Sequence, residues 1–257
     1  PFNGNANDES GNDNNGTVIG ATLATDRYGT DSRAYSFDGS NDIIVFPNTI
    51  GKNGNFSLSY WKKVRSYPHL WNVFASIGNE VNTGGSCFDI QFLDNNNTFG
   101  ALMVSQSGPA TFSSSSVVPL NEWYHVNIVY DSNELIIYVN GTRDGATPFE
   151  NKVLKENTQK FIVGSKWEAG TYPLGYAGPW HFDGIADDIR IYNRALSGAE
   201  VTLLHSLETA TPTPVAPVII QQPADISTTT GMTVNFTVDA NGTNLAYQWQ
   251  KNGVDLN

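Results

Sequence analysis

The chain has 257 residues and carries 14 Lys and Arg against 25 Asp and Glu, which gives a formal net charge of -11. With so little positive charge it has almost no surface that can neutralise phosphates, so nucleic acid is excluded as a partner. Cys87 is the only cysteine, which rules out an internal disulfide. No run of residues approaches the roughly 18 apolar side chains that a membrane span requires.

The N-terminal segment, residues 3–15, is crowded with Asn and Asp side chains and broken by glycines that permit tight turns. Calcium takes about 6–8 oxygen ligands from carboxylates, amides and carbonyls, and this segment supplies such oxygens at short spacing. It therefore predicts a calcium site. The alternative is a metal-free loop whose side chains accept hydrogen bonds from nearby backbone amides. The candidate ligands within the loop are Asn5, Asp8, Asn12 and Asn14.

Alternation of apolar and polar residues dominates the chain from there to residue 192. Such alternation is typical of strands with one buried face and one exposed face. About ten strands separated by turn residues predict an all-β fold, a sandwich of two antiparallel sheets. The predicted strands are residues 34–38, 42–46, 56–61, 73–77, 87–92, 99–104, 124–130, 135–139, 161–164 and 184–192.

Turn residues indicate how two of these strands connect. The polar residues 131–134 suit a short hairpin between strands 124–130 and 135–139. Asn140 and Gly141 follow, a pair that readily adopts the positive φ angles of a tight turn. Consecutive strands are therefore expected to pair directly.

A basic and aromatic cluster follows the strand at residues 56–61. Cations beside rings can bind an acidic or sulfated polysaccharide, and Arg65 and Trp71 are the candidate contacts. The alternative is a strand end whose charges are simply solvated. Trp61 and Trp123, by contrast, lie in alternating strands and are predicted to be core residues. The members of the cluster are Lys62, Lys63, Arg65, Tyr67, His69 and Trp71.

The segment 166–180 joins two predicted strands and is rich in rings, without an alternation that would bury them. Exposed rings next to polar groups form platforms for the flat faces of sugars. A glycan contact is therefore expected here. The alternative is that one or two rings pack the segment onto the sandwich. The candidate contacts are Trp167, Tyr172, Tyr176 and Trp180.

One helix is predicted, over residues 197–204, because Ser197 and Glu200 have the spacing of an N-terminal capping box. Residues 208–217 are rich in Pro and Thr, which predicts an extended linker. The segment 218–257 carries strand signals around a tryptophan and resembles the first half of an immunoglobulin-like domain.

Three parts of the first 207 residues together resemble the laminin-G-like, concanavalin A-like lectin/glucanase superfamily found in bacterial surface and secreted proteins. The resemblance implies a jelly-roll sandwich over residues 1–207 that binds carbohydrate or protein ligands. The segments that carry it are the opening loop at residues 1–11 with residues 34–39, residues 123–126, and residues 184–197.

The same resemblance implies that the opening loop closes on the acidic pair Asp187 and Asp188, with calcium between them. Asp8 and one member of the pair would then be ligands. Because adjacent strand residues point to opposite faces, only one of the two can reach the loop, and Asp187 is favoured.

The glucanases of this superfamily depend on a strand with Glu-x-Asp-x-x-Glu, which puts its carboxylates on one face. That motif does not occur in the sequence, so an enzyme is not predicted. The sequence predicts a non-catalytic, calcium-stabilised, carbohydrate-binding module of a larger secreted or cell-surface protein, working with other domains of that chain. A protein-binding adhesion domain is the main alternative, and a polysaccharide-degrading enzyme domain is a third interpretation.

Overall fold

The structure is a computed structural model that is described in two units, because contacts divide the chain into Pro1–Thr209 and Ala210–Asn257. The described residues are 2–47, 54–68, 71–77, 88–93, 98–105, 108–117, 119–148, 160–165, 181–210, 215–242 and 245–256.

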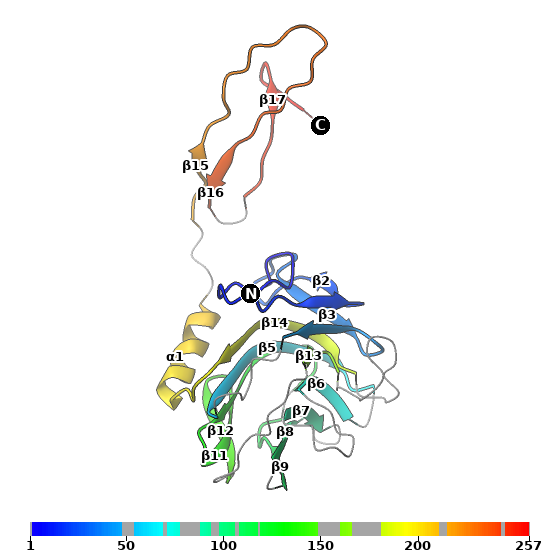
Figure 1. Cartoon of the computed structure of the whole chain (residues 1–257), viewed down its shortest axis with the longest axis vertical. Coiled ribbons are helices and arrows are strands. Elements are labelled where there is room, and N and C mark those ends of the chain that lie inside the picture. The colour runs from blue at the N-terminus through cyan, green and yellow to red at the C-terminus, as the bar shows by residue number, and fades with distance from the viewer. Residues whose placement is uncertain are drawn as a thin grey trace. The chain divides into compact units, whose positions relative to one another are not determined.

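In its described part, the larger unit is a sandwich of two seven-stranded antiparallel sheets, as the sequence predicted (Figure 1). The first sheet has the order β1 (Thr17–Ile19), β4 (Ile43–Phe46), β13 (Phe161–Val163), β6 (Trp71–Ile77), β7 (Phe88–Leu93), β8 (Thr98–Ser105) and β9 (Gly108–Ser113). The second has the order β12 (Thr142–Pro148), β11 (Glu134–Val139), β10 (Trp123–Tyr130), β5 (Phe56–Ser66), β14 (Asp183–Tyr192), β3 (Ala34–Asp38) and β2 (Thr22–Ala24).

The hairpin between β10 and β11 forms as its turn residues indicated. The carboxylate of Asp131 accepts hydrogen bonds from the backbone amides of Asn133 and Glu134, both at 2.9 Å. Asn140 and Gly141 then take φ angles of 49° and 74° and turn the chain into β12. Gly141 is also the point where the final helix comes closest, since a Cβ there would lie 2.9 Å from His205.

Side chains from both sheets meet in one apolar core. The alternation of β5 directs Phe56, Leu58 and Tyr60 inward, and Tyr60 stacks on Phe74 of β6 with ring centroids 4.2 Å apart. Phe182, next to β14, meets Phe74 edge-on at 5.2 Å. Burying side chains of this size stabilises the fold by about 1.5–3 kcal/mol each.

The two tryptophans predicted to be core residues behave differently. Trp61 is buried, at 4% exposure, but it pairs in register with Asp187 on the face of β5 that points away from the core. Trp123 is only half-buried, because it is the first residue of β10 and stands at the end of the strand. The prediction of a buried ring is therefore confirmed for Trp61, although that ring lies on the outer face of the sheet, and it was wrong for Trp123.

The helix α1 (Gly198–Thr209) covers part of the outer face of the second sheet (Figure 1). Its predicted capping box is present: the amide of Ser197 donates to the Glu200 carboxylate at 2.8 Å, and the amide of Glu200 donates to the Ser197 hydroxyl at 3.3 Å. Val201 packs against Val129 beneath it. The helix runs past the predicted end at residue 204, so Glu208, which the sequence assigned to the linker, lies in its last turn and is 5% exposed.

The smaller unit contains two short antiparallel pairs in its described part. They are β15 (Val218–Gln221) with β16 (Asp239–Asn241), and β17 (Gln250–Lys251) with β18 (Val254–Asp255). Trp249 is 42% exposed and lies 6.4 Å from the ring of Phe236. The immunoglobulin-like interpretation of this unit stays a prediction. In the described parts of both units, no helix is long and apolar enough to cross a membrane.

Candidate functional site

The N-terminal loop is organised around the carboxylate of Asp8. That carboxylate accepts hydrogen bonds from the amide of Ser10 at 2.8 Å, and from the backbone and side-chain amides of Asn14 at 3.0 and 3.1 Å. Partial burial acts in the opposite direction, but these bonds lower the pKa of Asp8 to about 2. Asp8 is therefore ionised at neutral pH.

The other predicted calcium ligands also make hydrogen bonds within the loop. The side-chain oxygen of Asn5 accepts from the amide of Asn7 at 2.8 Å, and the side-chain amide of Asn12 donates to the Ser10 hydroxyl at 2.7 Å. No group of three or more His, Cys, Asp or Glu side chains in the described residues is placed to hold a metal. Calcium here would depend on amide and carbonyl oxygens, and it stays a prediction.

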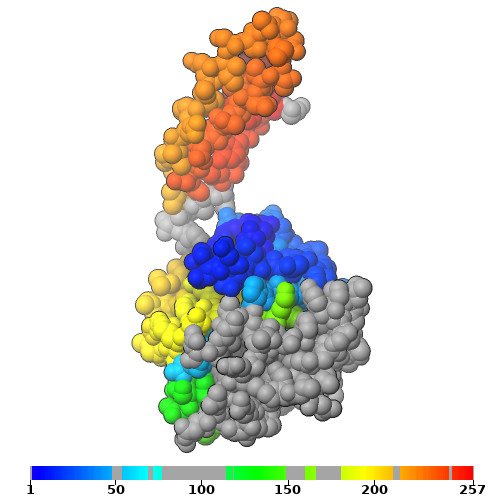
Figure 2. Space-filling view, viewed as in Figure 1, coloured from blue at the N-terminus to red at the C-terminus, as the bar shows by residue number. Residues whose placement is uncertain are grey.

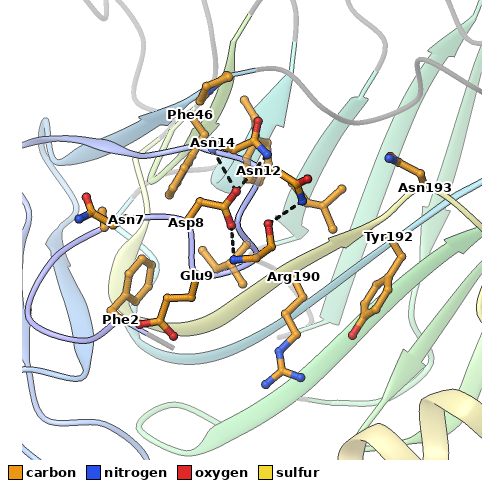
Figure 3. Close-up of a pocket in the computed structure, with 16 residues that line it drawn as sticks. Phe2, Asn7, Asp8, Glu9, Asn12, Asn14, Phe46, Arg190, Tyr192 and Asn193 are labelled. Atoms are coloured by element: carbon orange, nitrogen blue, oxygen red, sulfur yellow. Dashed lines mark hydrogen bonds between the residues drawn. The ribbon is translucent and has the colours of Figure 1, made fainter.

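The loop forms one wall of a cleft of about 730 Å³ (Figure 3). The opposite wall is the end of β14, residues 189–192, with Asn193 directly after it, and Phe46 and Phe161 from two strands of the first sheet also line the cleft. In the space-filling view the N-terminal residues form one compact blue surface above this part of the sandwich (Figure 2). Figure 3 shows Asp8, Asn12 and Asn14 gathered on the loop side of the cleft, next to Phe46.

The cleft combines apolar side chains with exposed amides. Phe46 and Ile191 are partly buried and give it apolar surface, while Asn7, Asn12 and Asn193 are exposed at its rim. Apolar surface can contact the C–H faces of a sugar ring, and amides both donate to and accept from hydroxyls. This combination is suited to binding a polar, uncharged ligand.

The Asp8 carboxyl of the cleft differs from the general acid of a glycoside hydrolase. Glycoside cleavage needs one carboxyl group with a raised pKa that can donate a proton. The pKa of Asp8 is lowered instead, and the neighbouring Glu9 accepts a hydrogen bond from the side chain of Asn3.

The acidic pair at residues 187–188 binds an arginine. The register of β14 shifts between Asp187 and Arg190, and Asp188 takes a φ of 47°, which marks a β-bulge. Both carboxylates consequently reach the guanidinium of Arg27, Asp187 at 2.6 Å and Asp188 at 2.5 Å. The expectation of strict alternation, with only one acid available, was therefore wrong. Asp187 is 2% exposed, and a cation already neutralises it.

Glu208 inserts its carboxylate into the same buried region. It accepts from the indole of Trp61 at 2.6 Å and from Arg190 at 2.8 Å, and it lies 3.4 Å from His125. Burial, with the charges of neighbouring residues, lowers the pKa of His125 to about 3. Arg27, Asp187, Asp188, Arg190 and Glu208, with Trp61 and His125, are called the outer-face network below.

Two of the described cations in the basic cluster, Lys62 and Arg65, are not free on the surface. Lys62 occupies an inward position of β5 and is fully buried, with its ammonium 5.4 Å from the Tyr60 ring and 5.5 Å from the Phe74 ring. Burial lowers its pKa well below the usual range. Arg65, proposed as a ligand contact, is paired with Asp183 at 2.9 Å. Because side chains alternate along the strand, Lys62 and Arg65 point to opposite faces of the sheet. Their closeness in the sequence therefore does not place them in one patch.

The remaining predicted contacts lie outside the part of the chain that is described. Residues Trp167, Tyr172, Tyr176 and Trp180 fall in the undescribed segment 166–180, and only the backbone of Trp71 is described, as the first residue of β6. Sequence reasoning also missed Arg27 and Glu208. One usable signal existed, because an acidic chain with few arginines must match its buried acids with those arginines.

Comparisons with known proteins agree with this architecture. A family model of the concanavalin A-like lectin/glucanases superfamily matches residues 38–202, well over half of the chain. Among solved structures, domain 4 of AbnA, an extracellular GH43 arabinanase from Geobacillus stearothermophilus solved with arabinotriose, is 20% identical with a TM-score of 0.59. The match covers 79% of this chain and 94% of that one.

Two toxin domains have the same fold. The binding domain of Paraclostridial Mosquitocidal Protein 1 is 17% identical with a TM-score of 0.59, over 83% of this chain and 55% of that one. The botulinum neurotoxin serotype D binding domain is 16% identical with a TM-score of 0.57, over 78% of this chain and 48% of that one. The chain thus spans about half the length of these two domains. A search of curated proteins found no match.

Proposed function

Because the chain belongs to the concanavalin A-like lectin/glucanase superfamily, we propose that it is a non-catalytic carbohydrate-binding module of a larger secreted or cell-surface protein. The arabinanase domain supports a glycan ligand and an extracellular setting, since that enzyme is extracellular and the structure of its domain contains arabinotriose. The function itself has to be argued from the site, because one fold serves many functions.

The cleft between the N-terminal loop and β14 is the observation that carries the proposal. It is open, about 730 Å³ in volume, and lined by Phe46 together with amides of the loop and of Asn193. Sites for small polar ligands typically have this size and this mixture of apolar surface with a few polar groups. In the proposed complex a sugar ring packs on Phe46, and Asn12 and Asn193 exchange hydrogen bonds with its hydroxyls.

The aromatic segment 166–180 is kept as a second proposed contact. Its rings Trp167, Tyr172, Tyr176 and Trp180, with Trp71, would extend the binding surface along a longer glycan. This part of the proposal rests on the sequence pattern.

Calcium is proposed as a stabilising ion of the N-terminal loop alone. Asp187 is removed from the ligand set because Arg27 already neutralises it. The oxygens that remain suitable are those of the Asp8 carboxylate, which has capacity beyond its three hydrogen bonds, and the side-chain carbonyls of Asn12 and Asn14. Bound there, calcium would link these loop residues to one another and so order the loop.

A glycan array followed by calorimetry on the best polysaccharide tests the proposed function. We expect Asn193→Ala and Phe46→Ala to weaken binding by roughly tenfold or more, the loss of one good contact, while Trp167→Ala and Trp180→Ala test the aromatic segment. Melting temperatures of each variant separate lost contacts from lost stability. The cleft is excluded if its variants bind normally.

Two further outcomes would change the functional class. Release of reducing sugar from the bound polysaccharide would indicate an enzyme domain. Failure to bind any glycan, together with binding of a protein, would favour an adhesion domain.

A further inference from the structure

The charges at the cleft bear on which glycans it can take. Asp8 and Glu9 are adjacent carboxylates on the same wall of the cleft, Asp8 partly exposed and Glu9 exposed. Both lie on the loop wall, among the amides that would bind the hydroxyls of a ligand. An anionic sugar placed there would have its charge close to two others of the same sign.

The positive charge at the cleft is already neutralised. Among the residues that line the described cleft, Arg190 is the one cation, and its guanidinium binds Glu208 at 2.8 Å with Asp188 at 3.7 Å. Both acids are buried, which strengthens their attraction to the guanidinium relative to that of an exposed pair. Arg190 is therefore a poor partner for a ligand carboxylate or sulfate.

Two cations of the basic cluster are also engaged. Arg65 pairs with Asp183, and Lys62 is buried among rings. The groups that remain available in the cleft are amides, which suit hydroxyls and carry no charge.

We infer that the cleft selects neutral glycans and rejects those that carry uronate or sulfate groups. This inference rests on the proposed function and narrows it. The selectivity arises from the acidic wall formed by Asp8 and Glu9 together with an Arg190 that is already paired with Glu208, in addition to the general repulsion of an acidic chain.

The test uses matched polymers that differ in charge but share a backbone: hydroxyethylcellulose with carboxymethylcellulose, dextran with dextran sulfate, and methyl-esterified pectin with polygalacturonate. For each pair that binds, we expect the neutral member to bind tighter by roughly tenfold or more at low salt with a chelator present, so that no calcium offsets the charge of Asp8; this is the size expected for nearby like charges. Raising the salt concentration should reduce the difference in affinity between the neutral and acidic members of a pair, because screening weakens repulsion between exposed charges.

Glu9→Lys should reduce this preference by roughly threefold or more at low salt, since it replaces repulsion with attraction. Asp225→Lys is the matched control, because it changes the net charge equally but lies in the smaller unit. The inference is overturned if acidic members bind as tightly as neutral ones, or if both variants shift the preference equally. If no polymer in any pair binds, the proposed function fails, and the inference fails with it.

Discussion

The two segments that bound the sandwich domain both close on β14, but different chemistry holds them. The N-terminal loop meets the end of the strand through an open cleft and is ordered by hydrogen bonds among Asn, Asp and Ser side chains that are mostly exposed. The end of α1 meets the middle of the strand through the outer-face network, in which Arg27 is 7% exposed and Glu208 5%. The loop therefore faces solvent, whereas the end of the helix is fixed by buried ion pairs.

The different chemistry of these two contacts should affect how much each contributes to the stability of the domain. A typical hydrogen bond contributes about 0.5–1.5 kcal/mol net, whereas removing one partner from a buried ion pair costs about 3–5 kcal/mol because it leaves an uncompensated charge. The network also surrounds its central guanidinium with the rings of Tyr28 and Trp61, at 4.4 and 4.8 Å from their centroids. Variants of the network should therefore be far more destabilising than variants of the loop.

The largest effect is expected from Arg27→Met, which keeps much of the side-chain volume but leaves Asp187 and Asp188 without their shared cation. The free energy of unfolding should fall by about 3–5 kcal/mol, measured by urea denaturation. Arg143→Met is the control, because its pair with Glu134 at 3.0 Å is about half exposed and should cost less than about 1 kcal/mol. Equal losses in the two variants would mean that the network does not anchor the domain.

The second effect concerns pH and depends on His125. Its pKa is about 3 in the fold and 6.5 when unperturbed, so between these values the unfolded chain binds more protons and stability falls as pH falls. Burial and Asp188 raise the pKa of Asp187 to about 7, and burial also raises that of Glu208, so both groups oppose this trend over part of the same window. The curve of stability against pH for the whole protein therefore combines contributions of opposite sign.

Comparison with His125→Asn isolates the histidine. The stability advantage of the wild-type chain over this variant should shrink as pH is lowered from 7 to 4, by up to about 1.4 kcal/mol per pH unit below 6.5. Urea denaturation at several pH values measures it. A constant difference across that range would show that His125 is not held neutral by the outer-face network.

The sequence predicted the parts of the fold that depend on local patterns. All ten strands predicted for the sandwich formed, and the Asn140-Gly141 turn and the Ser197 capping box were found from short motifs. The strands missed in the described sandwich, β1, β2, β9 and β12, are the edges of its two sheets. Three of them have no fully buried residue, so burial does not impose an alternating pattern on them.

The outer-face network was missed for a different reason. Arg27 meets Asp187 across 160 residues and Trp61 meets Glu208 across 147, so no local spacing reveals either pair. The acidic pair was noticed, but only the bulge at Asp188 shows that both carboxylates share one cation. Only one wall of the candidate cleft could be predicted from the sequence. The loop wall is a dense local motif, whereas the β14 wall is brought next to it only by the fold.

The smallest effect is expected at the loop, where Asp8→Ala removes the acceptor of three hydrogen bonds. With a chelator present, the loss should be about 1 kcal/mol, because these bonds are partly exposed. With excess calcium the loss should be larger, since an ion that binds only the folded state adds stability that the variant cannot gain.

Asp131→Ala is the matched control. Asp131 also accepts hydrogen bonds from two backbone amides at 2.9 Å, in a hairpin turn with no proposed calcium, so this variant should lose the same stability in both buffers. Thermal melts of the three proteins in both buffers give the answer. If Asp8→Ala also costs the same in both, the loop's own hydrogen bonds account for its order and the calcium proposal is wrong.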